Sequence, residues 1–135
     1  FVEATGDAAE NVSSAAWWHP AVSYDGEGLF GATADYVAAF EAEYGSIPDY
    51  AEASATAAGV ILQLAIEQAG SIESQAVRDA LAALDVMTFY GPVRFGETGQ
   101  ITSLEPPVFQ IQGGEPKVIY PEAVKQADMN FGGIQ

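Results

Sequence analysis

The chain has 135 residues, and its 19 acidic side chains against 4 basic ones give a net charge of −15. This balance argues against nucleic acid and anionic membrane surfaces as partners, because both are bound through clustered Lys and Arg. The chain lacks cysteine, which excludes disulfides, thiolate catalysis and metal sites built on cysteine.

The first predicted element is a buried strand at residues 11–18, with the sequence NVSSAAWW. Glu10 precedes this strand, and His19 with the following proline ends it. The glycine-containing segment 23–31 is a predicted loop. A helix is expected from about residue 29 to residue 44. Its apolar side chains, spaced three and four apart on one face, are Phe30, Ala34, Val37, Phe40 and Tyr44.

Two further helices are predicted in the middle of the chain. Asp49 can cap a helix over residues 50–69, and Glu52 completes a capping-box pattern. The first half of this helix consists mainly of small residues, and its second half is apolar and expected to be largely buried. A third helix is predicted over residues 74–84.

The last third changes from helical to strand periodicity. Residues 91–101 are predicted to form a strand and a turn, and residues 107–121 two strands around a Gly-Gly hairpin. Residues 122–135 are a polar tail. The order of strand, three helices and three short strands indicates an α/β protein. Because so few strands cannot cover three helices, we expect the chain to be part of a larger α/β molecule.

No motif for catalysis or for a cofactor is evident. His19 is the only histidine, and no serine lies in a nucleophile elbow, so no hydrolytic triad is predicted. The sequence has no phosphate-binding loop with its lysine, and the acidic loop at residues 24–28 lacks the ligand spacing of a calcium site. The remaining acids are too numerous to single out a carboxylate pair. We predict no cofactor and no metal.

A binding pocket for a small cation is the chemistry that remains. Aromatic rings can form the walls of such a pocket, and a carboxylate selects a positively charged group such as an α-ammonium. Glu10, Trp17, Trp18 and Tyr50 could supply this set. The alternative is equally compatible with the residues: the tryptophans belong to the core, and Glu10 is solvated.

Five stretches, taken in order, resemble one known family over nearly the whole chain. They are GDAAENV, WWHP, YVAAFEAEYGSIPDYAEASATAAGVILQLAIEQAGS, VRDALAALDVMTFYGPVRFGETGQ and VFQIQGGEPKVIYP. The first is similar to a Gly-x-(Ala/Ser)-Ala-Glu-Gly strand entry, and the fourth to a segment with Gly-Pro-(Val/Leu)-x-Phe-Asp. Together they resemble the C-terminal third of type I periplasmic solute-binding proteins, in the Leu/Ile/Val-binding branch of ABC importers.

The resemblance implies two lobes, each a three-layer α/β/α structure. Three hinge crossings would join the lobes, and the ligand would be held between them. Residues 1–46 would then belong to the second lobe, 47–105 to the first lobe, and 106–135 to the hinge return, the hairpin and the tail. The chain would lack the N-terminal part of the protein. We expect it to accompany that part or a second copy of itself, since otherwise Ile61 and Leu64 would expose an apolar face.

Three residues are carried over or considered as ligand contacts. In amino-acid binders of the family the Glu of the Ala-Glu-Gly stretch contacts the ligand α-ammonium, and Glu10 occupies that place. An aromatic residue before the long first-lobe helix lines the side-chain pocket, and Tyr50 occupies that place. Trp18 is the third candidate, since successive strand residues point to opposite faces and at most one tryptophan shares the surroundings of Glu10. Asn11 departs from the family, which has Gly there.

The resemblance implies a non-enzymatic receptor that closes over a small ligand, an amino acid or a related amide, and delivers it to a membrane ABC permease. It implies a periplasmic or extracellular location, with a lipid anchor through the preceding segment as one option. Two alternatives remain. One is a ligand-sensing domain of a signalling receptor on the same scaffold, and the other is an enzyme of unrecognised type, against which a single histidine and no cysteine argue.

Overall fold

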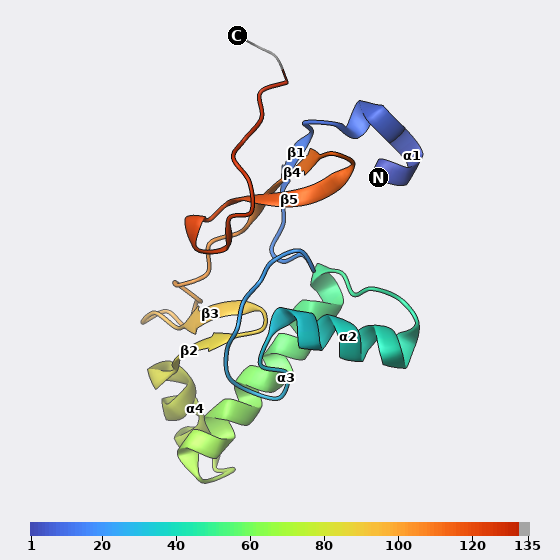
Figure 1. Ribbon diagram of the computed structural model, residues 1–135. Coiled ribbons are helices and arrows are strands. Elements are labelled where there is room, and N and C mark those ends of the chain that lie inside the picture. Colours follow the sequence, from blue (N-terminus) through green and yellow to red (C-terminus); the bar gives the residue numbers. More distant parts are fainter. Residues whose placement is uncertain (133–135) are drawn as a thin grey trace. The chain divides into compact units, whose positions relative to one another are not determined.

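The computed structural model describes residues 1–132 (Figure 1), so the end of the predicted polar tail, residues 133–135, lies outside the described residues. The chain divides into two compact units. Unit 1 comprises residues 1–22 and the chain from residue 105 onward, and unit 2 comprises residues 23–104. No helix within residues 1–132 combines the length and the apolar character needed to cross a membrane.

Unit 1 is built on a three-stranded antiparallel sheet in the order β1-β4-β5. The strands are β1 (Ser13–Ala15), β4 (Val108–Gln112) and β5 (Glu115–Tyr120), and a two-residue Gly-Gly turn joins β4 to β5 as predicted. The chain enters the sheet through the short helix α1 (Val2–Thr5) and the 3₁₀ turn η1 (Gly6–Ala9). After β5 it forms the 3₁₀ turn η2 (Glu122–Val124).

The prediction of a buried strand over residues 11–18 is wrong in extent and in burial. Strand β1 has only three residues, and all three are exposed. Asn11 adopts a left-handed backbone with φ 66°, which interrupts an extended strand before it begins. Because β1 is an edge strand that pairs with β4 alone, its serine side chains face solvent.

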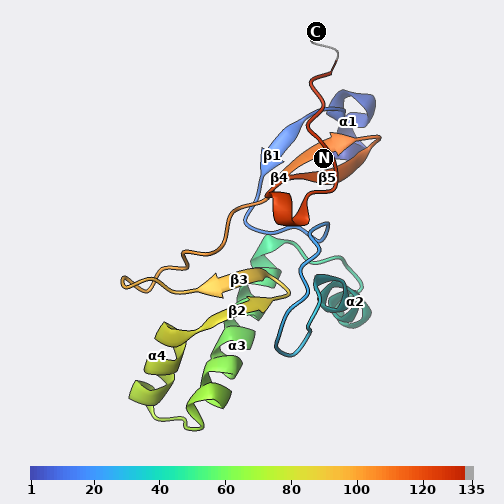
Figure 2. The ribbon, with the colours of Figure 1, turned by 60° about the vertical axis from the view of Figure 1, so that its left-hand side comes forward.

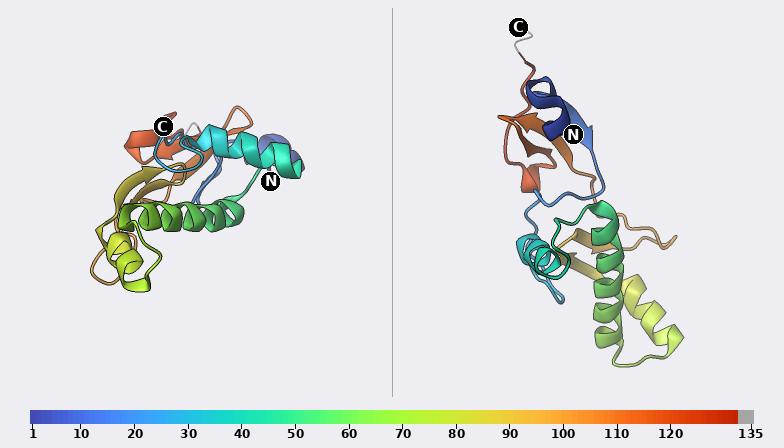
Figure 3. Two further views of the ribbon diagram at one scale, coloured as in Figure 1. Left: turned by 90° about the horizontal axis from the view of Figure 1, so that it is seen from below. Right: turned by 90° about the vertical axis from the view of Figure 1, so that its right-hand side faces the viewer.

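Unit 2 contains α2 (Thr33–Tyr44), α3 (Tyr50–Ala69) and α4 (Ser74–Ala83), followed by the antiparallel pair β2 (Asp85–Thr88) and β3 (Gly91–Arg94). Helix α4 packs beside the C-terminal half of α3 (Figure 2, Figure 3). Strand β2 was not predicted, because the two residues of its turn, Phe89 and Tyr90, are not typical turn residues.

Helix α3 begins and ends at the predicted residues. The Asp49 side chain accepts a hydrogen bond from the Ala51 amide at 2.8 Å, and the Glu52 side chain accepts one from the Asp49 amide at 3.1 Å. Gly70 ends the helix in the left-handed conformation. In the apolar second half, Val60 and Ala65 are buried. Ile61, Leu64 and Ile66 are half-buried, and Leu62 is 47% exposed, so this half of the helix is less buried than predicted.

The buried face of α2 differs from the predicted stripe. The helix starts at Thr33 rather than near residue 29, and its buried residues are Thr33 and Tyr36. Phe30 lies before the helix, and its ring packs against Tyr36 with centroids 5.2 Å apart. Tyr36 in turn packs on Phe89, a fully buried residue whose ring centroid is 4.2 Å away. The unpredicted β2–β3 turn thus supplies the centre of this core.

Buried threonines pair the backbone groups of this turn. Thr33 Oγ1 donates to the Phe89 carbonyl at 2.7 Å and accepts from the Tyr24 amide at 3.1 Å. Thr88 Oγ1 donates to the Gly91 carbonyl at 3.0 Å and accepts from the Tyr90 amide at 3.2 Å. A buried backbone group without a partner costs about 1–3 kcal/mol. These two side chains therefore stabilise the turn, because they bind backbone groups that the β-ladder leaves without partners.

The same substitution at two glycines of unit 2 should change stability in opposite directions. A Cβ added to Gly26 would overlap the backbone carbonyl group of Met87, whereas a Cβ added to Gly59 in α3 meets nothing within 4 Å. We expect Gly26→Ala to lower the free energy of unfolding by about 1–3 kcal/mol through overpacking. Gly59→Ala should raise it by about 0.5–1 kcal/mol, because Ala favours the helix. Urea unfolding of both variants measures this, and equal stabilities would contradict the close approach at Gly26.

Candidate functional site

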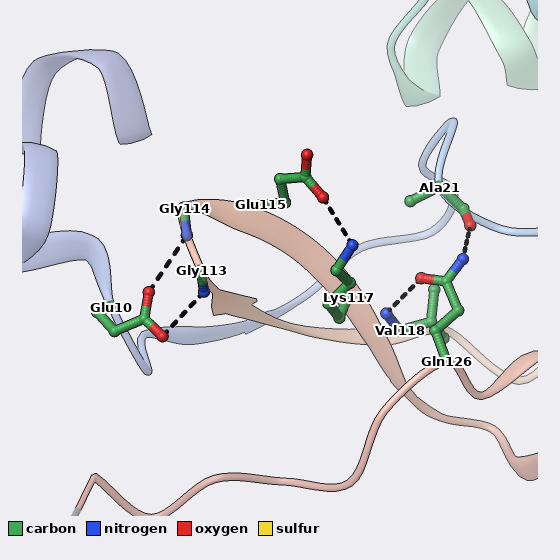
Figure 4. Close-up of polar contacts among 8 residues, drawn as sticks. All are labelled: Glu10, Ala21, Gly113, Gly114, Glu115, Lys117, Val118 and Gln126. Carbon is green, nitrogen blue, oxygen red and sulfur yellow. Dashed lines mark hydrogen bonds and ion pairs between the residues drawn. The ribbon is translucent and has the colours of Figure 1, made fainter.

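Glu10 holds the turn of the β4–β5 hairpin. Its side chain is exposed, and its two carboxylate oxygens accept hydrogen bonds from consecutive backbone amides, Gly113 at 3.0 Å and Gly114 at 3.3 Å (Figure 4). A carboxylate offers about four acceptor positions, so two remain for a further donor. The acid is therefore fixed in orientation and is still able to bind a cation.

Local backbone structure brings Glu10 to this turn. Glu10 directly follows the 3₁₀ turn η1, and its amide donates to the Asp7 carbonyl at 3.2 Å. Asn11 follows with its left-handed backbone, and its amide donates to the Ile111 carbonyl of β4 at 2.8 Å. The positive φ of Asn11, a backbone conformation that Gly adopts most readily, turns the chain onto β4.

The hairpin presents its amides because both turn residues are glycines in the left-handed region, with φ 64° at Gly113 and 79° at Gly114. Two positive φ values are typical of the type I′ turn that joins two-residue hairpins. A Cβ at either glycine would meet nothing within 4 Å, which leaves the turn open around the carboxylate.

A surface depression of about 400 Å³ lies beside this turn, within unit 1. It is lined by Val2, Gly6, Asp7, Glu10, Gly113 and Gly114. Asp7 and Glu10 are three residues apart around a 3₁₀ turn, a spacing that places two side chains on the same side. The depression therefore combines two acids with backbone and apolar surface.

The charge of this depression is not compensated inside the described part of the chain. Neither Asp7 nor Glu10 forms an ion pair there. Three of the basic residues are paired elsewhere: Lys117 with Glu115 at 2.7 Å, Lys125 with Asp128 at 2.7 Å, and Arg94 with Asp85 at 3.8 Å. The field at the depression is negative, which favours a positively charged ligand group.

Trp18 is buried in unit 1, with 2% of its surface exposed, whereas Trp17 is 60% exposed. This burial favours the alternative that Trp18 belongs to the core, and its role as a ligand contact stays a prediction. His19 follows, with its ring 4.7 Å from that of Phe109 and its Nδ1 accepting a hydrogen bond from the Ala21 amide at 3.0 Å.

Gln126 also binds the loop that follows His19. Its side-chain amide donates to the Ala21 carbonyl at 2.7 Å, and its oxygen accepts from the Val118 amide at 3.0 Å (Figure 4). The tail after β5 is thereby connected both to the sheet and to the loop. His19 is part of this packing in unit 1.

Tyr50 lies in unit 2, at the first position of α3, and its side chain is 52% exposed. The Ser54 hydroxyl donates to its carbonyl at 2.6 Å, so the first turn of the helix is tied by a side chain as well as by the Asp49 cap. Glu10 and Trp18 belong to unit 1 and Tyr50 to unit 2. Their joint role in one pocket stays a prediction.

Sequence reasoning missed Asp7 and the hairpin amides as parts of the Glu10 site. The spacing of Asp7 from Glu10 was available, but a 3₁₀ turn was not predicted there. The Gly-Gly hairpin was predicted, yet nothing in the sequence shows that it meets an acid 103 residues away. Within residues 1–132, no group of three or more acidic or histidine side chains is arranged to hold a metal ion.

Comparisons with known proteins identify relatives of the chain. A sequence model of the family described as periplasmic binding protein matches residues 1–115. A leucine binding protein from Thermotoga maritima has 20% sequence identity and a TM-score of 0.59 over 87% of this chain and 32% of that one, and this likeness shows the fold alone. A candidate branched-chain amino acid ABC transporter from Rhodospirillum rubrum has 28% identity and a TM-score of 0.68, over 87% of this chain and 33% of that one.

These likenesses confirm the predicted resemblance and the predicted α/β fold class of type I periplasmic binding proteins. The chain spans about a third of the length of each of the two solved structures that it matches. The expectation that it corresponds to part of a larger α/β molecule agrees with this coverage. The assignment of residues 1–46, 47–105 and 106–135 to lobes of the whole protein stays a prediction.

Replacement of Glu10 should loosen the hairpin turn. In Glu10→Gln the side chain keeps one acceptor oxygen, so one of the two glycine amides loses its partner. We expect amide hydrogen exchange at Gly113 or Gly114 to accelerate by about tenfold, the scale of one hydrogen bond to a charged group. Glu115→Gln, which makes the same change at a neighbouring acid that binds Lys117 instead of the glycine amides, is the control. Unchanged exchange in Glu10→Gln, measured by NMR, would contradict the assigned contact.

His19 should contribute a pH dependence to stability. Burial lowers the pKa of its imidazole below the ordinary value of 6.5. The folded state therefore resists protonation, and stability falls as the pH drops through the pKa of the unfolded state, near 6.5. We expect the urea midpoint to fall between about pH 7.5 and about pH 5.5. In His19→Asn, whose oxygen can accept from the Ala21 amide, the fall should be smaller; equal falls would contradict the prediction.

Proposed function

Because the chain belongs to the periplasmic binding protein family, we propose that it forms part of an extracytoplasmic solute receptor that takes an amino acid as its ligand. Members of the family are non-enzymatic receptors, and we assign no catalytic role to any residue. The observation that carries the proposal is the Glu10 carboxylate, held by two backbone amides at the edge of a negative depression.

The α-ammonium group of an amino acid suits this acid. An ammonium donates hydrogen bonds and carries a full positive charge, and Glu10 keeps acceptor positions that the glycine amides do not use. Asp7 adds a second negative charge to the same depression. The two solved relatives, a leucine binding protein and a candidate branched-chain amino acid ABC transporter, support an apolar amino acid such as leucine as the ligand.

Tyr50 is the proposed wall for the ligand side chain. Its exposed ring, at the first position of α3, is free to pack against an aliphatic group. Trp18 has a weaker case, since its ring is almost completely buried. We propose Glu10 and Tyr50 as the contacts of the complete protein and retain Trp18 as a candidate only if ligand binding uncovers it.

The mechanism that we propose is closure of two lobes around the ligand, followed by delivery to an ABC permease. A ligand shifts an open–closed equilibrium only through its preference for the closed state. The partners of this chain would be the rest of the same protein, or a second copy, together with the permease. The apolar surface of the half-buried Ile61 and Leu64 in α3 supports such an additional packing partner.

The ammonium contact is tested by calorimetry with L-leucine and the full-length protein. Glu10→Gln should weaken binding by about 1–3 kcal/mol, because it replaces a charge-assisted hydrogen bond with a neutral one. 4-Methylpentanoate, which is leucine without its amino group, should bind the wild type more weakly than leucine does, and Glu10→Gln should reduce that difference. Glu3→Gln, a change of the same chemistry on α1, is the matched control.

Two results would contradict the proposal. One is an affinity for L-leucine that is equal in the wild type and in Glu10→Gln. The other is an equal loss for 4-methylpentanoate and for leucine on substitution of Glu10, because that would show an effect on the protein rather than on the ammonium group.

A further inference from the structure

A chain of two hydroxyl groups joins the β2–β3 turn to the residue that carries the proposed pocket wall. The Ser54 hydroxyl donates to the Tyr50 carbonyl at 2.6 Å, and Ser54 Oγ lies 2.8 Å from the hydroxyl oxygen of Tyr90. A serine hydroxyl has one proton. Since Ser54 gives that proton to the carbonyl, Tyr90 is the donor to Ser54.

Tyr90 is held more rigidly than the helix end that it contacts. Its side chain is 9% exposed, and its amide donates to the buried Thr88 hydroxyl at 3.2 Å. The preceding residue, Phe89, is fully buried, and its carbonyl accepts from Thr33 Oγ1. The hydroxyl of Tyr90 therefore projects from a turn that is fixed by the core of unit 2.

Tyr50 by contrast begins a helix, where the first amide groups lack intrahelical partners and the chain frays. The Asp49 cap restrains the helix from one side through the Ala51 amide. The bond from Ser54 restrains the Tyr50 carbonyl from the other. Of these restraints, only the one through Ser54 reaches the rigid β2–β3 turn.

We propose that Tyr90 is a positioning residue for ligand binding, which acts through Ser54 to hold the first turn of α3 and thereby the ring of Tyr50. This inference rests on the proposed function of Tyr50 as the pocket wall. A pocket wall that is already ordered loses less conformational entropy when the ligand binds. Removal of the Tyr90 hydroxyl therefore weakens ligand binding without removing any ligand contact.

Tyr36 provides a matched control for this role. Its hydroxyl also reaches a hydroxyl of α3, with Tyr36 Oη 3.5 Å from Thr56 Oγ1, and its side chain is buried. Within the described part of the chain, the Thr56 hydroxyl makes no hydrogen bond to the Tyr50 carbonyl, and Thr56 lies two residues beyond Ser54 along the helix. Tyr90→Phe and Tyr36→Phe thus remove the same group against the same helix, and the group removed in Tyr90→Phe is the one that contacts the Ser54 hydroxyl bound to Tyr50.

The binding test uses L-leucine and calorimetry on the full-length protein. We expect Tyr90→Phe and Ser54→Ala each to weaken leucine binding by about 3–10-fold, the scale of one neutral hydrogen bond, and Tyr36→Phe to stay within about twofold. In a Tyr50→Ala background, Tyr90→Phe should cause no further loss, because the residue through which it acts is gone. A loss of the same size in that background would overturn the inference.

A second measurement does not depend on the ligand. Hydrogen exchange of the amides at residues 50–54, read by NMR, should accelerate in Tyr90→Phe and not in Tyr36→Phe. Equal exchange in the two variants would overturn the positioning role.

The two proposals fail in distinguishable ways. If Tyr50→Ala leaves leucine affinity unchanged, the pocket wall is overturned and the positioning role in binding falls with it. If Tyr50→Ala weakens binding while Tyr90→Phe does not, only the positioning role is overturned.

Discussion

The structure depends on one constraint, that backbone groups buried outside regular ladders must find a partner. Three polar side chains are buried among the described residues, and each of them is a hydrogen-bond partner of such backbone groups. Gln110 donates to the carbonyls of Asn11 and Asn130 and accepts from the Asn130 amide, which binds the two ends of unit 1 to its sheet. Thr33 and Thr88 do the same for the β2–β3 turn of unit 2. Irregular segments of both units are thereby held by hydrogen bonds to buried side chains.

The proposed binding residues are oriented by the same kind of contact. Glu10 is held by the amides of Gly113 and Gly114, and the backbone of Tyr50 is held through Ser54. In both cases the partner comes from the backbone or from a hydroxyl group rather than from an opposite charge. The acid therefore keeps its negative charge uncompensated, which is what recognition of an ammonium group requires.

The sequence predicts those parts of the fold whose signals are local. Helix α3 carries both its capping box and its terminal glycine within the segment itself, and both of its ends are confirmed. Strand β1 is shorter and more exposed than predicted, because Asn11 turns the chain and edge pairing leaves the serines in solvent. The family was recognisable from ordered motifs. The contact of Glu10 with the hairpin was not, because it joins segments 103 residues apart and no local pattern records such a pairing.

The two-glycine turn has a consequence for how the sequence of this chain can diverge. The amides that donate hydrogen bonds to Glu10 belong to the main chain, so they persist whatever side chains occupy the neighbouring strands. What they do not tolerate is a change in the number of residues between β4 and β5, since one inserted residue would rotate both amides away from the acid. Substitutions in the strands around the hairpin are therefore tolerated, whereas a change in the length of its turn is not.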